Sequence, residues 1–280
     1  MYSNEQFHSV GQVTELVRDR SWSPRKDVFI FDLGALFDPH QTEMSQAFAD
    51  YLVEFASHRS CYLLANLNYA ETAYFVPSRV RRAFEGIFAS AGTEMWSQNE
   101  LLVRHEHTFS DDLYEFVAKL VLQSAYPEKK APLIDCGPAT LRVCLAGTRV
   151  SRTAKQAYLS WEREHGEIDR IVEMIQRRFP DYTVCKDTDV SVLIMPRSFS
   201  TARVQDHVLQ RHKSARLVTY LTPDASNGFA KPMCDAFLDT NIVATVAGAS
   251  DVSQLLSYEM RQIPVQPALG TVQLRLVREA

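Results

Sequence analysis

Short apolar runs alternate with segments of helical spacing along the first part of the chain. The runs at 27–36, 61–65 and 85–90 predict buried strands, and the segments at 43–56 and 69–84 predict helices. Strands separated by helices are typical of a parallel sheet with crossover helices. Such sheets bind ligands at the carboxyl ends of their strands, so Asp32, in the first run, is the foremost candidate site residue.

The pattern changes in the middle of the chain. Residues 110–124 and 156–179 have the apolar spacing of helices, whereas 133–145, 182–185 and 190–195 are strand-like. Helices and strands of this order, without strict alternation, indicate an α+β block of about a hundred residues.

The alternation of strands and helices resumes after Pro196. The predicted helices are 201–212, 233–238 and 252–261, the predicted strands are 217–221, 242–246 and 271–277, and 222–231 is a predicted polar loop.

We therefore predict an α/β fold, a Rossmannoid parallel-sheet core with an inserted α+β cap domain. The core would comprise 1–98 and 197–262, the cap 99–196 and a C-terminal tail 263–280.

The composition excludes several classes of protein. The chain has 280 residues, 46% of them hydrophobic, and a net charge of −4 without a basic stripe, so we expect no nucleic-acid partner. Its apolar runs are shorter than the roughly 18–20 residues of a membrane span, and the polar residues 1–20 do not resemble a signal peptide. Five cysteines without a C-x-x-C pair argue against zinc or disulfides. We expect a cytoplasmic protein.

Four stretches carry a resemblance to a known family. They are 29–38 (FIFDLGALFD), 62–96 (YLLANLNYA to GTEMW), 142–184 (RVCLAGTRV to DYTV) and 190–209 (VSVLIMPRSFSTARVQDHVL). In order and spacing they resemble the haloacid-dehalogenase superfamily, in its phosphomannomutase branch with a C2-type cap. The first stretch is similar to the motif hhhDxDGTL, and the last to the strand and helix that carry the third-motif lysine.

The resemblance implies phosphoryl transfer through an aspartyl-phosphate with Mg²⁺ as cofactor. Asp32 matches the nucleophile and a metal ligand; its other interpretation is an inherited strand-end Asp that caps a turn. The general-acid position falls on Gly34, which cannot transfer a proton, and Asp38 is the nearby substitute. The Thr or Ser position of the second motif falls on Ala65, which lacks a hydroxyl, and Asn66 or Asn68 could compensate in binding substrate.

The remaining motif positions are also altered. The lysine position falls on Thr201, and Arg203 and Arg197 are the neighbours that could hold phosphate in its place. Asp224 replaces the first acid of the fourth motif and, with Asp32, would ligate Mg²⁺; its other interpretation is a turn residue. In the cap, Arg149 matches the arginine of a substrate-binding turn.

These substitutions leave the function open between hypotheses. One is a pseudoenzyme that binds a ligand or a protein without catalysis or with weak activity, because losing residues that act as a unit abolishes most of a rate. The alternative is an active Mg²⁺-dependent phosphatase or phosphomutase acting on a sugar phosphate or nucleotide. In either case we expect a phosphorylated small-molecule partner, and the family resemblance implies a homodimer formed through the cap.

Overall fold

The computed structural model describes residues 27–38, 41, 43–148, 151–188, 190–236 and 241–261. The predicted tail strand at 271–277 and the candidate Arg149 lie outside these residues.

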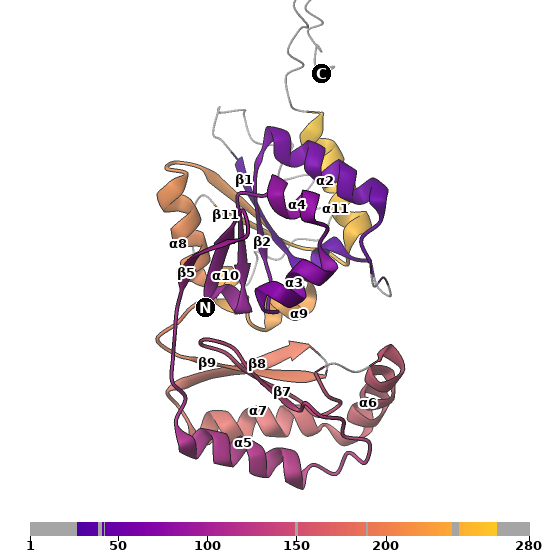
Figure 1. Ribbon diagram of the computed structural model, residues 1–280, viewed down its shortest axis with the longest axis vertical. Helices are drawn as coiled ribbons and strands as arrows, with labels where there is room; N and C mark the ends of the chain where they lie inside the picture. The colour runs from indigo at the N-terminus through magenta and orange to yellow at the C-terminus, as the bar shows by residue number, and fades with distance from the viewer. Residues whose placement is uncertain are drawn as a thin grey trace, which may run out of the picture.

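A seven-stranded sheet forms the centre of the larger part of the molecule, here called the core (Figure 1). Its order is β11-β10-β1-β2-β3-β4-β5, and the first five of these strands are parallel, whereas β4 and β5 form an antiparallel hairpin at the edge. The strands are β1 (Asp27–Asp32), β2 (Ser60–Leu64), β3 (Gly86–Ala89), β4 (Glu94–Ser97), β5 (Glu100–Arg104), β10 (Arg216–Leu221) and β11 (Asn241–Thr245).

Helices cover both faces of this sheet. Those on one face are α2 (Gln46–His58), α4 (Ser78–Ala83) and α11 (Ala249–Met260), and those on the other are α8 (Ala202–Arg211) and α10 (Lys231–Asp235) (Figure 1). The alternation of β1 explains the two layers, since Phe29 and Phe31 enter one apolar cluster and Val28 and Ile30 the other. Three short segments, η1 (Leu33–Leu36), α3 (Tyr69–Phe75) and α9 (Pro223–Asn227), follow the carboxyl ends of β1, β2 and β10.

The second part, here called the cap, is a four-stranded antiparallel sheet of order β6-β7-β9-β8. Its strands are β6 (Ile134–Cys136), β7 (Leu141–Cys144), β8 (Tyr182–Thr188) and β9 (Ser191–Pro196), and its helices are α5 (Asp111–Gln123), α6 (Arg152–His165) and α7 (Glu167–Arg178). The sheet lies between the core and helices α5 and α7, whose apolar faces share one cluster with it (Figure 1). The cap thus presents a sheet face to the carboxyl ends of the core strands.

Two local features differ from the sequence expectation. The predicted polar loop at 222–231 contains helix α9, which Thr222 caps by accepting a hydrogen bond from the amide of Ala225, with Pro223 in its first turn. The pattern also does not predict the β4–β5 hairpin, whose two-residue turn, Gln98 and Asn99, has positive φ angles of 52° and 67°. Both elements are short, and both depend on individual capping or turn residues, which a pattern of hydrophobic positions does not reveal.

Cap and core also lie close together just after helix α9. A Cβ atom added to Gly228 would lie 2.5 Å from the carbonyl oxygen of Lys186, in β8 of the cap. The same atom would lie 2.7 Å from the carbonyl oxygen of Asp224 in α9, so any residue other than glycine would require the cap or this turn to move.

Within the described residues, no helix combines the length and apolar character needed to cross a bilayer.

Candidate functional site

Asp32 lies at the carboxyl end of β1 and is almost closed off from solvent. Asp32 is 4% exposed. Its carboxylate accepts two hydrogen bonds from Thr222, which follows β10: one from the hydroxyl over 2.7 Å and one from the backbone amide over 3.3 Å. Burial raises the pKa of the Asp32 carboxyl from 3.8 to about 6; the Thr222 hydrogen bonds oppose this rise, and the negative charge of Asp187 adds to it. The candidate nucleophile is thus held inside the protein by a core residue.

Gly34, at the general-acid position, lies directly against this pair. A Cβ atom at Gly34 would be 2.9 Å from Cγ2 of Thr222 and 3.1 Å from Oδ2 of Asp32. An acidic side chain therefore cannot replace Gly34 unless Thr222 moves.

Asp38, the predicted substitute acid, is hydrogen-bonded to the start of helix α11. Its carboxylate accepts hydrogen bonds from the amide and hydroxyl of Ser250, over 2.8 Å and 2.9 Å, in the first turn of α11. A carboxylate in this position stabilises the start of a helix. In the described part of the chain no hydrogen bond or ion pair joins Asp38 to Asp32.

The two phosphate-holding positions are occupied by buried residues. Ala65 is fully buried after β2, and Thr201 is fully buried before α8, where its hydroxyl donates a 2.7 Å hydrogen bond to the carbonyl of Phe229. Arg203 is exposed on α8 and lies near His105; burial lowers the pKa of that imidazole, and the charge of Arg203 lowers it further. Arg203 and Asp32 make no contact with each other among the described residues.

The described residues do not assemble a magnesium site. Asp224 is exposed in the first turn of α9, and no group of three His, Cys, Asp or Glu residues among those described could hold a metal. One carboxylate oxygen of Asp32 already accepts both Thr222 donors. Mg²⁺ needs several hard oxygen ligands in a near-octahedral array, so these residues do not fit it, and magnesium binding stays a prediction from the family resemblance.

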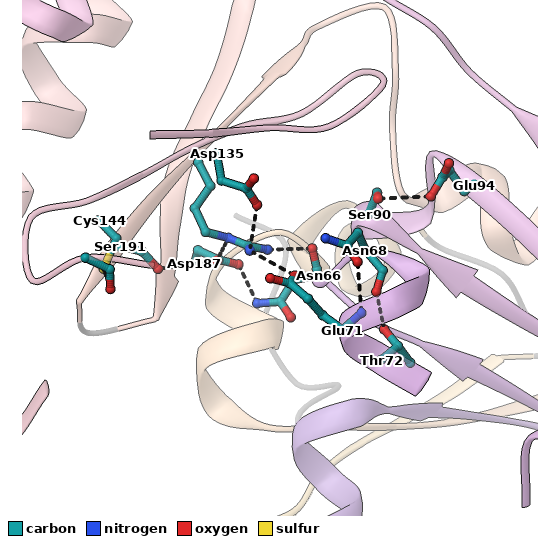
Figure 2. A network of polar contacts seen from close by, with 12 residues as sticks. Asn66, Asn68, Glu71, Thr72, Ser90, Glu94, Asp135, Cys144, Asp187 and Ser191 are labelled. Atoms are coloured by element: carbon teal, nitrogen blue, oxygen red, sulfur yellow. Dashed lines mark hydrogen bonds and ion pairs between the residues drawn. The ribbon is translucent and has the colours of Figure 1, made fainter. Parts of the chain in front are cut away.

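Asn66, the predicted substrate-binding residue, binds the cap instead. Its amide donates a 2.6 Å hydrogen bond to the carboxylate of Asp187 in β8, and Figure 2 shows these two side chains pointing toward each other. Asp187 is 3% exposed and also accepts hydrogen bonds from Nε of Arg142 over 2.8 Å and from the hydroxyl of Ser191 over 3.3 Å. Arg142, in β7, also donates a 2.7 Å hydrogen bond to the carbonyl of Asn66. We call Asn66, Arg142 and Asp187 the latch, because they join core and cap.

The latch residues from the cap were not among the sequence candidates. The family resemblance implies an acid on the later cap strand at the position of Leu193, which is apolar and fully buried here. The carboxylate comes from the neighbouring strand, since Asp187 in β8 lies beside Ser191 in β9. A search for every acid that alternates with buried residues on both cap strands could have found it.

A cavity of about 430 Å³ lies next to the latch, between core and cap. Its lining includes two charged pairs from different elements, Glu94 with Arg104 and Asp135 with Arg142. Glu94 is 4% exposed; one of its oxygens accepts from Arg104 over 2.9 Å, and the other accepts from Ser90. The volume lies within the roughly 300–1,000 Å³ of small-molecule sites.

Two aromatic residues also line this cavity. Tyr69 and Trp96 stack with ring centroids 4.2 Å apart and an interplanar angle of 10°. Glu94 and Trp96 belong to a stretch that carries the family resemblance, so their position was visible in the sequence, but no chemical role marked them there.

Comparisons with known proteins give a likeness of structure and none of sequence. No family model matches the chain, and no curated protein matches its sequence. An IMP-nucleotidase from Plasmodium falciparum, with IMP bound, superposes with a TM-score of 0.58 at 9% identity, over 90% of this chain and 71% of that one. A haloacid dehalogenase-like hydrolase from Bacteroides thetaiotaomicron has a TM-score of 0.54 at 9% identity, over 84% of this chain and 100% of that one.

A third similar structure is the C-terminal domain of trehalose-6-phosphate phosphatase from C. albicans. It has a TM-score of 0.52 at 11% identity, over 77% of this chain and 75% of that one. At such identities the likeness concerns the fold, and it confirms the predicted fold class. The chain has a haloacid-dehalogenase-like fold, a mostly parallel α/β sheet with a separate antiparallel insertion. The phosphomannomutase branch stays a prediction.

Proposed function

We propose that this chain is a non-catalytic protein of haloacid-dehalogenase-like fold that binds a small molecule in the cavity between core and cap. The observation that carries the proposal is the burial of Asp32, which is 4% exposed and hydrogen-bonded to Thr222. A nucleophile needs an open line of approach to phosphorus, with cationic groups around it to offset the charge of the phosphate.

The surroundings of Asp32 support the same conclusion. The acid position is Gly34, pressed against Thr222, and the lysine position is Thr201, which is fully buried and donates to the backbone of Phe229. A residue that is packed and hydrogen-bonded within the core cannot also hold a phosphate. Three parts of a catalytic unit are thus used for internal contacts, and such losses remove nearly all of a rate.

The latch supports retained binding without chemistry. It joins the cap to the core through Asp187, whose charge raises the pKa of Asp32 further and would also repel a phosphate brought to that carboxylate. The cavity beside the latch keeps a defined polar and aromatic lining. Ligand binding therefore has a place in this molecule even where phosphoryl transfer does not.

A phosphate-release assay tests the proposal. The whole chain is incubated with Mg²⁺ and a panel of p-nitrophenyl phosphate, hexose phosphates and IMP, beside Asp32→Asn and the exposed control Asp206→Asn. We expect all three proteins to release phosphate at the same background rate. Release that Asp32→Asn abolishes and Asp206→Asn retains would overturn the proposal.

The same assay decides the alternative function, a weakly active phosphatase or phosphomutase. The observation that favours it is the retained carboxylate at the end of β1, whose pKa of about 6 leaves it mostly ionised at neutral pH. This hypothesis also requires a phosphorylated small molecule as partner, and binding of IMP by the similar nucleotidase makes IMP a suitable member of the panel.

A homodimer through the cap is a separate part of the proposal. Leu122 of α5 is 80% exposed and Met174 of α7 is 46% exposed, and both helices lie on the face of the cap away from the core (Figure 1). Solution mass from light scattering tests it, because a strict monomer at micromolar concentration contradicts dimerisation.

A further inference from the structure

The cavity between core and cap has a charge balance that argues against a phosphate ligand. Arg104 is paired with Glu94 at 2.8 Å, and Arg142 is paired with Asp187 at 2.8 Å. Two further carboxylates, Asp135 at 3.8 Å and Glu71 at 3.9 Å, also lie near Arg142.

Two guanidinium groups and four carboxylates therefore line this cavity or form ion pairs with its lining. A third guanidinium, that of Arg81, donates to the hydroxyl of Tyr69 and lies over its ring, which leaves a surplus of one negative charge. Anionic sites usually offer unpaired arginines in a fork geometry, and both lining arginines are already paired here. A negative surplus in a partly enclosed site favours neutral or cationic ligands over anions.

The carboxylate of Asp135 is the one that a ligand can reach. Its side chain is 36% exposed, it lines the cavity, and its oxygen lies 3.8 Å from Arg142, beyond hydrogen-bonding distance. An ionised carboxylate has acceptor sites for hydroxyl or ammonium donors. Glu94, in contrast, is 4% exposed and has both oxygens engaged by Arg104 and Ser90.

The stacked pair of Tyr69 and Trp96 adds an aromatic side to the same cavity. Aromatic rings provide flat apolar surface together with a negative face that attracts cations. An acidic, hydrogen-bonding cavity with an aromatic side suits a ring that carries both C–H faces and hydroxyl groups.

We propose that this cavity binds a non-phosphorylated, hydroxylated ring of hexose size, and that it prefers one carrying a protonated amine. The amine would lie by Asp135, and the ring would lie against the aromatic pair. This proposal rests on the proposed binding function, and it names the ligand class that the site would take.

Calorimetric titration of the whole chain with glucosamine, glucose, glucose 6-phosphate and putrescine tests the proposal. We expect glucosamine to bind about tenfold more tightly than glucose, as expected for one charge pair in a half-solvated site. Glucose 6-phosphate should bind most weakly. Tighter binding of glucose 6-phosphate than of glucose contradicts the charge argument, and putrescine binding as tightly as glucosamine contradicts recognition of the ring.

Two variants locate the site. Asp135→Asn should weaken glucosamine binding about tenfold more than glucose binding and so remove the advantage of glucosamine, whereas the exposed control Asp181→Asn should alter neither affinity. Trp96 supplies an optical signal, because a fluorescence change on sugar addition should be present in the unmodified chain and lost in Trp96→Phe. A change that persists in Trp96→Phe, or a glucosamine preference that persists in Asp135→Asn, places the ligand elsewhere and overturns the assignment.

Failure of the ligand assignment can be distinguished from failure of the proposed function. If the chain hydrolyses glucose 6-phosphate in an Asp32-dependent way, the non-catalytic proposal fails whatever the sugars do. If it hydrolyses nothing and binds none of the four probes, only the ligand assignment fails.

Discussion

The hydroxyl of Thr222 donates a 2.7 Å hydrogen bond to the carboxylate of Asp32, joining the ends of two neighbouring strands, β10 and β1. The contact satisfies a buried acid from within the core. It also leaves that acid with a raised pKa, because the hydrogen bonds of Thr222 offset its desolvation only in part.

Asp32 should make the stability of the protein fall as pH rises. Its folded pKa of about 6 exceeds the ordinary value of 3.8, so the native state binds this proton more tightly than the unfolded chain does. Stability from this group is complete below about pH 4 and lost as pH rises through about 6, a change of at most about 3 kcal/mol. Urea unfolding of Asp32→Asn should therefore show a stability advantage over the unmodified chain that grows across this window. An advantage that does not change with pH contradicts the raised pKa.

Gly34→Ala should destabilise the chain through contact with Thr222. The new Cβ would lie 2.9 Å from Cγ2 of Thr222, and overpacking of this kind costs about 1–3 kcal/mol. Thr222→Ser removes that methyl group and keeps the hydroxyl, so it should relieve part of the cost when the two changes are combined. A double-mutant cycle from thermal unfolding measures the coupling, and strictly additive effects would show that the two side chains do not meet.

The hydroxyl of Thr201 should contribute to stability, whereas a lysine at this position should not be tolerated. Thr201→Val leaves the carbonyl of Phe229 without its 2.7 Å donor, which costs about 1–3 kcal/mol, and Thr201→Ser keeps the donor. Thr201→Lys places an ammonium group at a fully buried position and should unfold the chain or its surroundings. Chemical denaturation compares the three variants. If Thr201→Lys is as stable as the unmodified chain, residue 201 can reach an open cleft, which contradicts the observed packing.

Removal of the latch carboxylate should loosen the cap. In Asp187→Ala the guanidinium of Arg142, 11% exposed, loses its closest carboxylate partner, and breaking such a buried pair costs about 3–5 kcal/mol. The matched control is Asp169→Ala, whose 2.7 Å pair with Lys186 is exposed and should contribute less than about 1 kcal/mol. Limited proteolysis at the links between cap and core should be faster in the first variant alone. Equal rates for both variants contradict the role of the latch.

The core was predictable from sequence because its strands are buried on both faces and its helices on one. The run around Phe29 and the helix containing Leu52 follow from periodicity, and their order predicts the parallel sheet. The β4–β5 hairpin was not predictable in this way, because its turn depends on two residues with positive φ. Asp32 is recognisable by its place at a strand end, whereas its burial depends on Thr222, which is 190 residues away in the chain.

The latch illustrates the limit of pattern recognition for site residues. Asn66 follows a predicted strand and was a candidate by position, but its partner Asp187 is 121 residues further along the chain. No local feature of the sequence relates them, because one belongs to the core and the other to the sheet of the cap. Polar contacts between core and cap depend on how the two pack against each other in three dimensions, and hydrophobic periodicity carries no information about that packing.

The close approach at Gly228 also has a consequence for the size of the cavity. The backbone of Gly228 lies against the carbonyl oxygen of Lys186 without room for a side chain, so this contact limits how closely core and cap can approach here. A methyl group added there would meet both this carbonyl oxygen and that of Asp224 in α9, at 2.7 Å, so either the cap or the turn after α9 would have to move. We therefore expect this contact, made by a residue that does not line the cavity, to affect how closely core and cap approach each other around it.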